Sequence, residues 1–166
     1  MPFNADIQND FYAEASMLHG ALLLSPCSLT LRRSRSTKEF DVYDSLRDAW
    51  VALTPEEWVR QHFVNHMVTV LGFSPMRIAN EVSLKLNGNS RRADTVVYDD
   101  FLKPVLVVEY KAPNISLTRK VLEQALLYNL TINAKAIMIT NGKDVYSVVG
   151  EKMWRGVVTP NMLVEQ

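Results

Sequence analysis

The chain has 166 residues, of which 48% are hydrophobic and 22% are charged, values that are typical of a folded globular protein and exclude the disordered and membrane-embedded classes. Its 18 Lys and Arg residues are balanced by 18 Asp and Glu residues, so net charge does not favour a nucleic-acid partner and any basic surface must be local. The single cysteine, Cys27, excludes an intramolecular disulfide, and no apolar run is long enough to span a bilayer, so we expect a cytoplasmic location without membrane contact.

Residues 1–40 show no sustained hydrophobic period, which predicts a loosely attached or partner-dependent N-terminal arm. The arm ends in the basic run RRSRSTK, from Arg32 to Lys38. Such a run is typical of a solvated tail, but it also fits an arm that contacts DNA. The sequence leaves both interpretations open.

The stretch TPEEWVRQHFVNHMVTVLGF, residues 54–73, has the signals of a helix. Thr54 suits the N-cap, Pro55 suits the first helical position, and Glu57 lies three residues after the cap, as in a capping box. Apolar residues then recur at helical spacing until Gly72. These residues are Trp58, Val59, Phe63, Met67 and Val70.

Three strands are predicted next. The first is EVSLKLNG, residues 81–88, which alternates apolar and polar residues and ends in the turn signal Asn87-Gly88. The others are ADTVVYDD, residues 93–100, and PVLVVEYKA, residues 104–112. Because the connections are short, the three strands should form an antiparallel meander.

A second helix is predicted over residues 117–130, with Ser116 or Thr118 as its cap. The apolar strand AKAIMIT follows at residues 134–140, and Asn141-Gly142 then leads into the strand DVYSVV at residues 144–149. A helix between two strands usually makes a right-handed crossover to a parallel neighbour, so the sheet should be mixed. The positions on this helix that we expect to be buried are Val121, Ala125, Leu126 and Leu130.

The predicted fold is therefore α/β, in the order α-β-β-β-α-β-β, with a mixed central sheet flanked by helices. The folded domain is predicted over residues 41–150, and residues 151–166 form a C-terminal extension without a clear signal.

Two carboxylates should meet in this fold. Asp94 is placed at the start of the second strand and Glu109 at the end of the third, and these positions adjoin in an antiparallel hairpin. Lys111 shares the face of Glu109, because side chains two apart on a strand point the same way. Neighbouring carboxylates repel unless a cation lies between them, and Mg²⁺ would satisfy both and keep several waters. The backbone carbonyl of Tyr110 is a further oxygen ligand for that ion.

Lys111 has two possible roles at such a site. It would ordinarily be an ammonium group that stabilises anionic charge, or it could act as a general base if burial and the cation lowered its pKa. A divalent cation, a bound water, carboxylates and a lysine together suit attack on a phosphodiester. The site therefore predicts phosphoryl transfer as the reaction class.

The neighbouring residues suit a phosphate backbone. Gln124 and Tyr128 are four apart and share a face of the second predicted helix. Basic residues flank the candidate site, although the whole chain is neutral. These are Arg91 and Arg92 before Asp94, and Arg119 and Lys120 in the first turn of the second helix.

The segments RRADTVVYDD, VLVVEYKAP and LEQALLYN resemble the PD-(D/E)xK nuclease superfamily. In detail they resemble the N-terminal nuclease domain of Type I restriction enzyme R subunits, as do LTPEEWVRQHFVNHMV upstream and ITNGKDVYSV downstream. The resemblance covers roughly residues 41–150. It implies a restriction-endonuclease-like fold and cleavage of DNA phosphodiesters with Mg²⁺, for which Mn²⁺ is expected to substitute.

The resemblance also implies roles for individual residues. Asp94 and Glu109 would hold the metal, Lys111 would be the catalytic lysine, and Gln124 with Tyr128 would be the Q-xxx-Y pair that orients lysine or phosphate. Helix acids at the place of Glu57 often complete the metal shell in this fold, so that residue is left open between a metal ligand and a helix cap.

Two features depart from the family pattern. Ala93 stands where the proline of the motif name would be. No G-xxxx-G-K-[ST] loop is present, so we expect no ATP hydrolysis. The chain would then be a free-standing nuclease domain or a component that works with a separate helicase or translocase, with restriction-modification subunits, or as a homodimer.

Two other functional classes stay open. The first is a non-cleaving DNA-binding or docking module of a restriction-modification assembly, which should bind DNA in a salt-sensitive and metal-independent way. The second is a structural α/β domain without DNA affinity.

Overall fold

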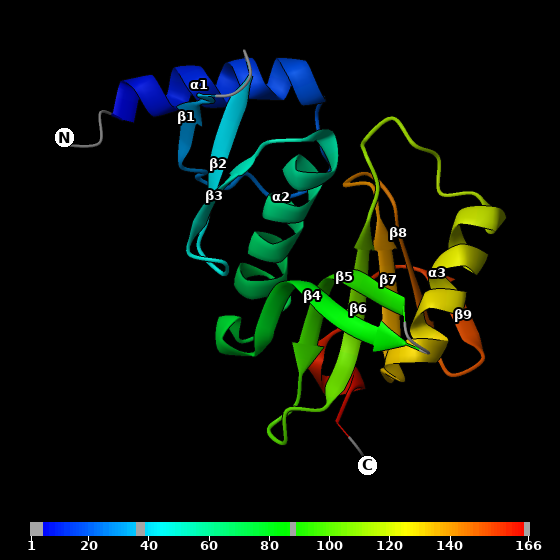
Figure 1. Cartoon of the computed structure of the whole chain (residues 1–166). Helices are drawn as coiled ribbons and strands as arrows, with labels where there is room; N and C mark the ends of the chain where they lie inside the picture. The colour runs from blue at the N-terminus through cyan, green and yellow to red at the C-terminus, as the bar shows by residue number, and fades with distance from the viewer. Residues whose placement is uncertain (1–4, 36–38, 87–88, 165–166) are drawn as a thin grey trace.

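The computed structural model describes residues 5–35, 39–86 and 89–164 (Figure 1). Its helices are α1 (Ala5–His19), α2 (Pro55–Thr69) and α3 (Arg119–Ile132), with short 3-10 turns η1 (Pro75–Arg77) and η2 (Pro160–Met162). Its strands are β1 (Leu31–Arg33), β2 (Phe40–Asp44), β3 (Ala49–Ala52), β4 (Ile78–Leu86), β5 (Asn89–Tyr98), β6 (Pro104–Tyr110), β7 (Ala136–Thr140), β8 (Val145–Val149) and β9 (Lys152–Arg155). Over residues 55–149 the elements follow the predicted order.

The larger sheet has six strands in the order β4-β5-β6-β7-β8-β9. Strands β4, β5 and β6 form the predicted antiparallel meander, and β6 and β7 form the predicted parallel pair, with Leu106 beside Ala136. The turn predicted at Asn87-Gly88 lies outside the described residues. The mixed sheet is thus confirmed, and β9 adds a strand that the sequence analysis did not contain.

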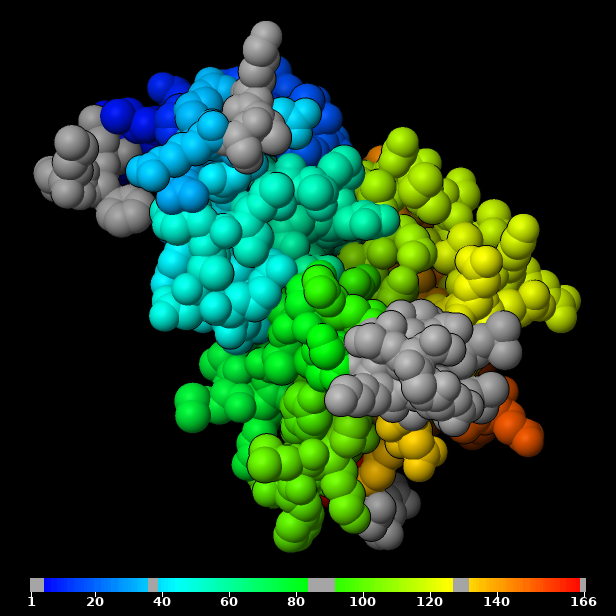
Figure 2. Space-filling view, in the orientation of Figure 1, coloured from blue at the N-terminus to red at the C-terminus, as the bar shows by residue number. Residues whose placement is uncertain are grey.

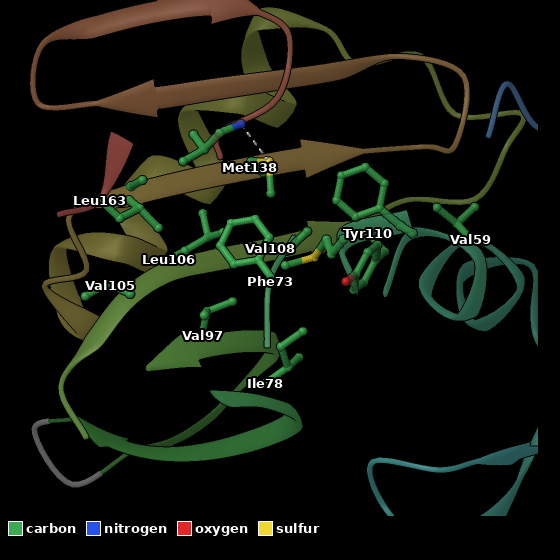
Figure 3. Close-up of a cluster of buried hydrophobic side chains, with 14 residues drawn as sticks. Val59, Phe73, Ile78, Val97, Val105, Leu106, Val108, Tyr110, Met138 and Leu163 are labelled. Atoms are coloured by element: carbon green, nitrogen blue, oxygen red, sulfur yellow. Dashed lines mark hydrogen bonds between the residues drawn. The ribbon is translucent and has the colours of Figure 1, made fainter. Parts of the chain in front are cut away.

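Helices α2 and α3 cover opposite faces of this sheet, as Figure 1 shows. On one face, Val59 and Phe63 of α2 pack in a core cluster with Val108 and Met138, whose side chains appear in Figure 3. On the other face, buried residues of α3 pack against Ile137 and Ile139 of β7. Strands β6 and β7 are buried on both faces of the sheet, which is the physical reason that they read as continuous apolar runs.

The start of α2 agrees with its sequence signals. The backbone N–H of Glu57 donates to Oγ1 of the N-cap Thr54 at 3.1 Å. Trp58, Val59, Phe63 and Met67 are buried as expected, whereas Val70 is exposed because it is the C-cap residue. Packing of α2 on the sheet sets Arg60 beside Asp94 inside β5 and Tyr110 at the end of β6.

The N-terminal region differs from the expected loose arm. Residues 5–19 form α1, and β1, β2 and β3 form a small antiparallel sheet. The side chain of Gln8 makes two hydrogen bonds to the backbone of Leu31, at 2.8 and 3.0 Å, and Tyr12 packs on Trp58 with ring centroids 5.3 Å apart. Hydrophobic periodicity missed α1 because polar and aromatic contacts hold it, and only Ala15 and His19 of its residues are buried.

The basic run is partly an internal feature of this region. Arg32 binds Asp41 at 3.0 Å and lies 4.3 Å above the ring of Trp50. Arg33 binds Glu14 at 2.6 Å. The first two residues of the run are therefore part of β1 and paired within the protein, whereas residues 36–38 of the run lie outside the described residues.

The N-terminal region also contacts the larger sheet. The backbone N–H of Leu23 donates to the carbonyl oxygen of Gly142 at 2.8 Å. Gly142 has a φ of +80°, and a Cβ at this position would lie 2.6 Å from Cδ2 of Leu22. The positive φ therefore favours glycine at the β7–β8 turn, and a Cβ there would also displace the end of the Leu22 side chain. In Figure 2 the N-terminal elements and the region of α2 form one continuous surface.

The C-terminal residues, for which the sequence had no clear signal, complete the fold. Strand β9 pairs with β8, and Val158 and Leu163 belong to the core cluster between α2 and the sheet. Most of β9 is exposed, so its sequence does not alternate and carries no strand pattern.

His62 gives the docking of α1 on α2 a predicted pH dependence. Its Nδ1 lies 2.7 Å from the carbonyl oxygen of Trp58, so Nδ1 carries the proton and Nε2 accepts the hydroxyl of Tyr12 at 2.8 Å. Burial lowers the pKa of His62, against a smaller opposing effect of its backbone hydrogen bond. The unfolded chain therefore binds a proton more readily than the folded one near pH 6.5. Stability present above that pH should be lost as the pH falls below it, by at most about 1.4 kcal/mol per pH unit for one proton.

Urea unfolding between pH 8 and pH 5.5 measures this effect. The variant His62→Gln should show a smaller loss of stability over that range than the wild type, because it cannot take up the proton. Burial also lowers the pKa values of His19 and His66, so some pH dependence should persist in the variant. Equal slopes for the two proteins would contradict the prediction.

Candidate active site

Three carboxylates form a row across neighbouring strands. The register pairs Asn80 with Thr95 and Val82 with Ala93, which sets Glu81 opposite Asp94. Thr95 in turn pairs with Val108, so Asp94 and Glu109 occupy the next positions of the β5–β6 pair. Asp94 lies inside β5 and not at its start, because β5 continues along β4 beyond the end of β6.

Asp94 is held by hydrogen bonds to both of its carboxylate oxygens. Oδ1 accepts from Nη2 of Arg60 at 3.1 Å, and Oδ2 accepts from the backbone N–H of Tyr110 at 3.0 Å. Tyr110 is itself buried and fixed, since its hydroxyl donates to Oγ1 of Thr95 at 3.0 Å. The position of the Asp94 carboxylate therefore follows from the pairing of β5 with β6.

Glu109 and Lys111 form the ion pair that their spacing predicts. Nζ of Lys111 lies 2.8 Å from Oε1 of Glu109, and both side chains are about three-quarters buried. Burial and then the negative charge of Asp94 raise the pKa of Glu109, although the bond to Lys111 opposes them. Asp94, Glu109 and Lys111 are thus close enough to interact electrostatically.

The pKa of Lys111 is raised. Burial acts to lower it, but the hydrogen bond to Glu109 and the charges of Glu109, Asp94 and Glu56 together outweigh burial. Its amine is therefore an ammonium group at neutral pH, which favours electrostatic stabilisation over the alternative of a general base.

The residues fit a divalent cation between Asp94 and Glu109. Two neighbouring carboxylates with a raised pKa on one of them form a site that a cation would stabilise, and Mg²⁺ commonly uses one or two protein carboxylates and keeps its waters. Within the described residues there is no group of three or more His, Cys, Asp and Glu side chains arranged to hold a metal. The predicted ligands therefore stay the carboxylates of Asp94 and Glu109, with the carbonyl of Tyr110 as a predicted third ligand.

Arg60 is a site residue that the sequence analysis missed. Its Nη1 lies 2.9 Å from Glu57 and 2.6 Å from Glu81, while Nη2 reaches Asp94. The guanidinium also lies 5.6 Å from the ring centre of Tyr110, and the residue is only 5% exposed. A signal was present in the sequence, because Glu57 and Arg60 stand at i and i+3, where oppositely charged side chains of a helix meet, and they flank the apolar pair Trp58 and Val59.

Glu57 binds arginines with its side chain. Besides Arg60, its carboxylate accepts from Arg47 at 2.6 Å and from Gln61 at 2.8 Å. Its backbone N–H makes the cap bond to Thr54, while the carboxylate turns away to the arginines. A role as metal ligand stays untested for this residue.

The other predicted site residues are exposed, or have side chains that lie outside the described residues. Gln124 is exposed on α3, and the side chain of Tyr128 lies outside the described residues. Arg119 is exposed and binds Glu123 at 2.8 Å, and Lys120 is exposed beside it. Arg92 binds Glu81 at 3.0 Å from the surface, and the side chain of Arg91 lies outside the described residues.

Comparison with known protein families shows the family to which the chain belongs. The family model described as Type I restriction enzyme R protein N terminus (HSDR_N) matches residues 55–156, which is more than half of the chain. The chain belongs to this family. The match begins with α2 and ends just after β9, so it includes Arg60, Asp94, Glu109 and Lys111, whereas α1 and the small sheet lie before it.

A solved structure is similar to this HSDR_N chain. It is described as "The fragment structure of a putative HsdR subunit of a type I restriction enzyme from Vibrio vulnificus YJ016", with 20% sequence identity and a TM-score of 0.55. The similarity covers 68% of this chain and 25% of that chain, so this chain spans about a quarter of that relative's length. At this identity the likeness concerns the fold. No curated protein matches the chain, and no described helix is long and apolar enough to cross a membrane.

Proposed function

We propose that this HSDR_N domain is a Mg²⁺-dependent DNA endonuclease with the restriction-endonuclease-like fold of the PD-(D/E)xK superfamily. The observation that carries the proposal is the convergence of Asp94, Glu109 and Lys111 at the end of β6, where burial and the charge of Asp94 raise the pKa of Glu109 and Lys111 is an ammonium group. This combination suits hydrolysis of a phosphodiester, in which water adds to phosphorus, the bond to the leaving oxygen breaks and that oxygen takes a proton.

Each residue of the chain has a distinct part in this reaction. Asp94 and Glu109 would hold Mg²⁺ or Mn²⁺, which when bound supplies positive charge and lowers the pKa of water. The ammonium group of Lys111 stabilises negative charge on the phosphate. The N–H of Tyr110 fixes the Asp94 carboxylate, and Gln124 and Tyr128 are proposed to orient lysine or phosphate.

The substrate is proposed to be DNA held by its phosphates. Arg92, Arg119 and Lys120 are exposed, and together with Arg91 they would contact the backbone by charge, without reading base sequence. Restriction-modification subunits, a separate helicase or translocase and a second copy of the chain are the proposed protein partners.

One observation favours a second candidate, the non-cleaving docking module. Both oxygens of Asp94 already accept hydrogen bonds, and Arg60 supplies positive charge among the acids without a metal. On this alternative the row of carboxylates is a structural ion-pair network. DNA binding would then depend on salt and be independent of divalent cations.

Calorimetric titration of Mg²⁺ and Mn²⁺ into the wild-type chain, followed by incubation with supercoiled and single-stranded DNA, tests the two candidates. Saturable metal binding with metal-dependent nicking supports the nuclease. DNA binding that needs no metal and yields no product, even with Mn²⁺, would favour the docking module. If the metal binds and the DNA stays intact, the same incubation with an ATP-driven translocase of a Type I system decides whether cutting needs a motor.

A further inference from the structure

The carboxylates of Glu81, Asp94 and Glu109 form a row with one gap between Glu81 and Asp94 and a second gap between Asp94 and Glu109. Cationic side chains neutralise the two gaps differently. Arg60 bridges the first gap, because its guanidinium binds Glu81 at 2.6 Å and Asp94 at 3.1 Å. In the second gap Lys111 binds Glu109 at 2.8 Å, and it acts on Asp94 only through its charge. The described side chains therefore neutralise the side of the row at β4 more completely than the side at β6.

The backbone of β4 is strained where it presents Glu81 to Arg60. Glu81 has a φ of +56°, in the left-handed region that residues with a Cβ occupy at a cost. Its carboxylate receives two arginines, Arg60 from the buried side and Arg92 from the surface. Strain of this kind persists where surrounding contacts hold it, and here the contact is the guanidinium of Arg60.

We propose that Arg60 is a positioning residue that takes the place of a second cation in this row, so that the domain binds one divalent cation, between Asp94 and Glu109. The inference rests on the proposed function, because it concerns the metal site of that function. It also assigns Glu57 to the arginine network, since its two oxygens are shared by Arg47, Gln61 and Arg60. Glu57 is then not a ligand of the ion.

The geometry of the guanidinium suits this role. A guanidinium presents several N–H groups in a rigid plane, so Nη1 can serve Glu57 and Glu81 while Nη2 serves Asp94. A lysine carries its three donors on a compact ammonium group at the end of a flexible stem, so it does not hold the acids in the fixed plane that a guanidinium provides. Each carboxylate oxygen has more than one acceptor site, so the bond from Arg60 orients Asp94 without preventing a bond to a metal.

Mn²⁺ titration of the full chain, by calorimetry and by electron paramagnetic resonance of free Mn²⁺, tests the inference. The wild type should bind one Mn²⁺ per chain. In Arg60→Met the acids Glu57, Glu81 and Asp94 lose their shared cation and become a set of oxygen ligands, so a second Mn²⁺ should bind. The melting temperature of this variant should then rise more with Mn²⁺ than that of the wild type.

Two further variants keep the test decisive. Arg60→Lys retains the charge without the fork, so it should bind one Mn²⁺ about 10- to 100-fold more weakly, the range for loss of a group that orients a metal ligand. Arg155→Met is the control, because Arg155 pairs with Asp144 at the surface, outside the row of carboxylates, with its side chain 69% exposed. It should bind one Mn²⁺ as the wild type does.

The outcomes separate this inference from the function on which it rests. Two Mn²⁺ ions in a wild type that cleaves DNA would overturn the single-cation inference alone. Absence of Mn²⁺ from the wild type would overturn both proposals. If Arg60→Met binds one Mn²⁺ with the affinity of the wild type, the proposed role of Arg60 is overturned. If Arg60→Met does not fold, unchanged affinity in Arg60→Lys would overturn it equally.

Discussion

Lys111→Met is expected to slow metal-dependent DNA cleavage by about 10²- to 10⁴-fold, the usual range for a side chain that stabilises or transfers charge in the reaction. The change removes the ammonium group and keeps most of the side-chain length. It also leaves Glu109 beside Asp94 without its 2.8 Å partner. Single-turnover nicking of supercoiled DNA at saturating Mg²⁺ measures the effect.

Asp94→Asn and Glu109→Gln should abolish cleavage by a different route. Each removes one of the two carboxylates proposed to hold the cation, so the loss should include metal binding itself, which calorimetry detects separately from cleavage. Lys111→Met, in contrast, should retain the metal. We therefore expect Lys111→Met to lose kcat and keep metal binding. We expect Asp94→Asn and Glu109→Gln to lose both.

The control variants are Glu151→Gln and Lys152→Met, which change the same residue types at exposed positions near the β8–β9 turn. Both should cut at the wild-type rate. Circular dichroism and melting temperature establish that each variant is folded. Wild-type cleavage by any of the three site variants would remove that residue from the proposed mechanism.

Trp58→Ala is expected to lower the free energy of unfolding by about 3–5 kcal/mol, the range for truncating a fully buried aromatic residue. The side chain is 1% exposed, and its ring centroid lies 4.1 Å from that of His62. Its Nε1 donates to the carbonyl oxygen of Gly20 at 3.1 Å. Because Trp58 belongs to α2 and Gly20 follows α1, the loss should include the docking of the N-terminal region.

Urea denaturation measures this loss, and hydrogen exchange of α1 amides locates it. Trp50→Ala is the matched control, because Trp50 is 37% exposed and contacts the guanidinium of Arg32 and the ring of Tyr43. It should cost only about 0.5–1 kcal/mol, the size of an exposed cation–π contact. A similar small cost for Trp58→Ala would mean that residues 5–20 are attached loosely.

The sequence alone determined the elements from α2 to β8 and the identity of the central candidate residues. Helical spacing with a Thr54 cap, and apolar runs bounded by turns, are local signals, and they placed α2, the meander and the crossover close to their observed bounds. The proximity of Asp94, Glu109 and Lys111 could be predicted because antiparallel pairing and two-residue alternation are geometric rules.

Only the tertiary structure decided the attachment of the N-terminal region and the place of Arg60. Helix α1 is held by side chains such as Gln8 and Tyr12, whose partners lie 23 and 50 residues away, so hydrophobic periodicity cannot reveal it. Arg60 meets Asp94 across 34 residues. Periodicity reports which face of an element is apolar, whereas the partner of a buried charge depends on which elements pack together, and that information exists only in the folded chain.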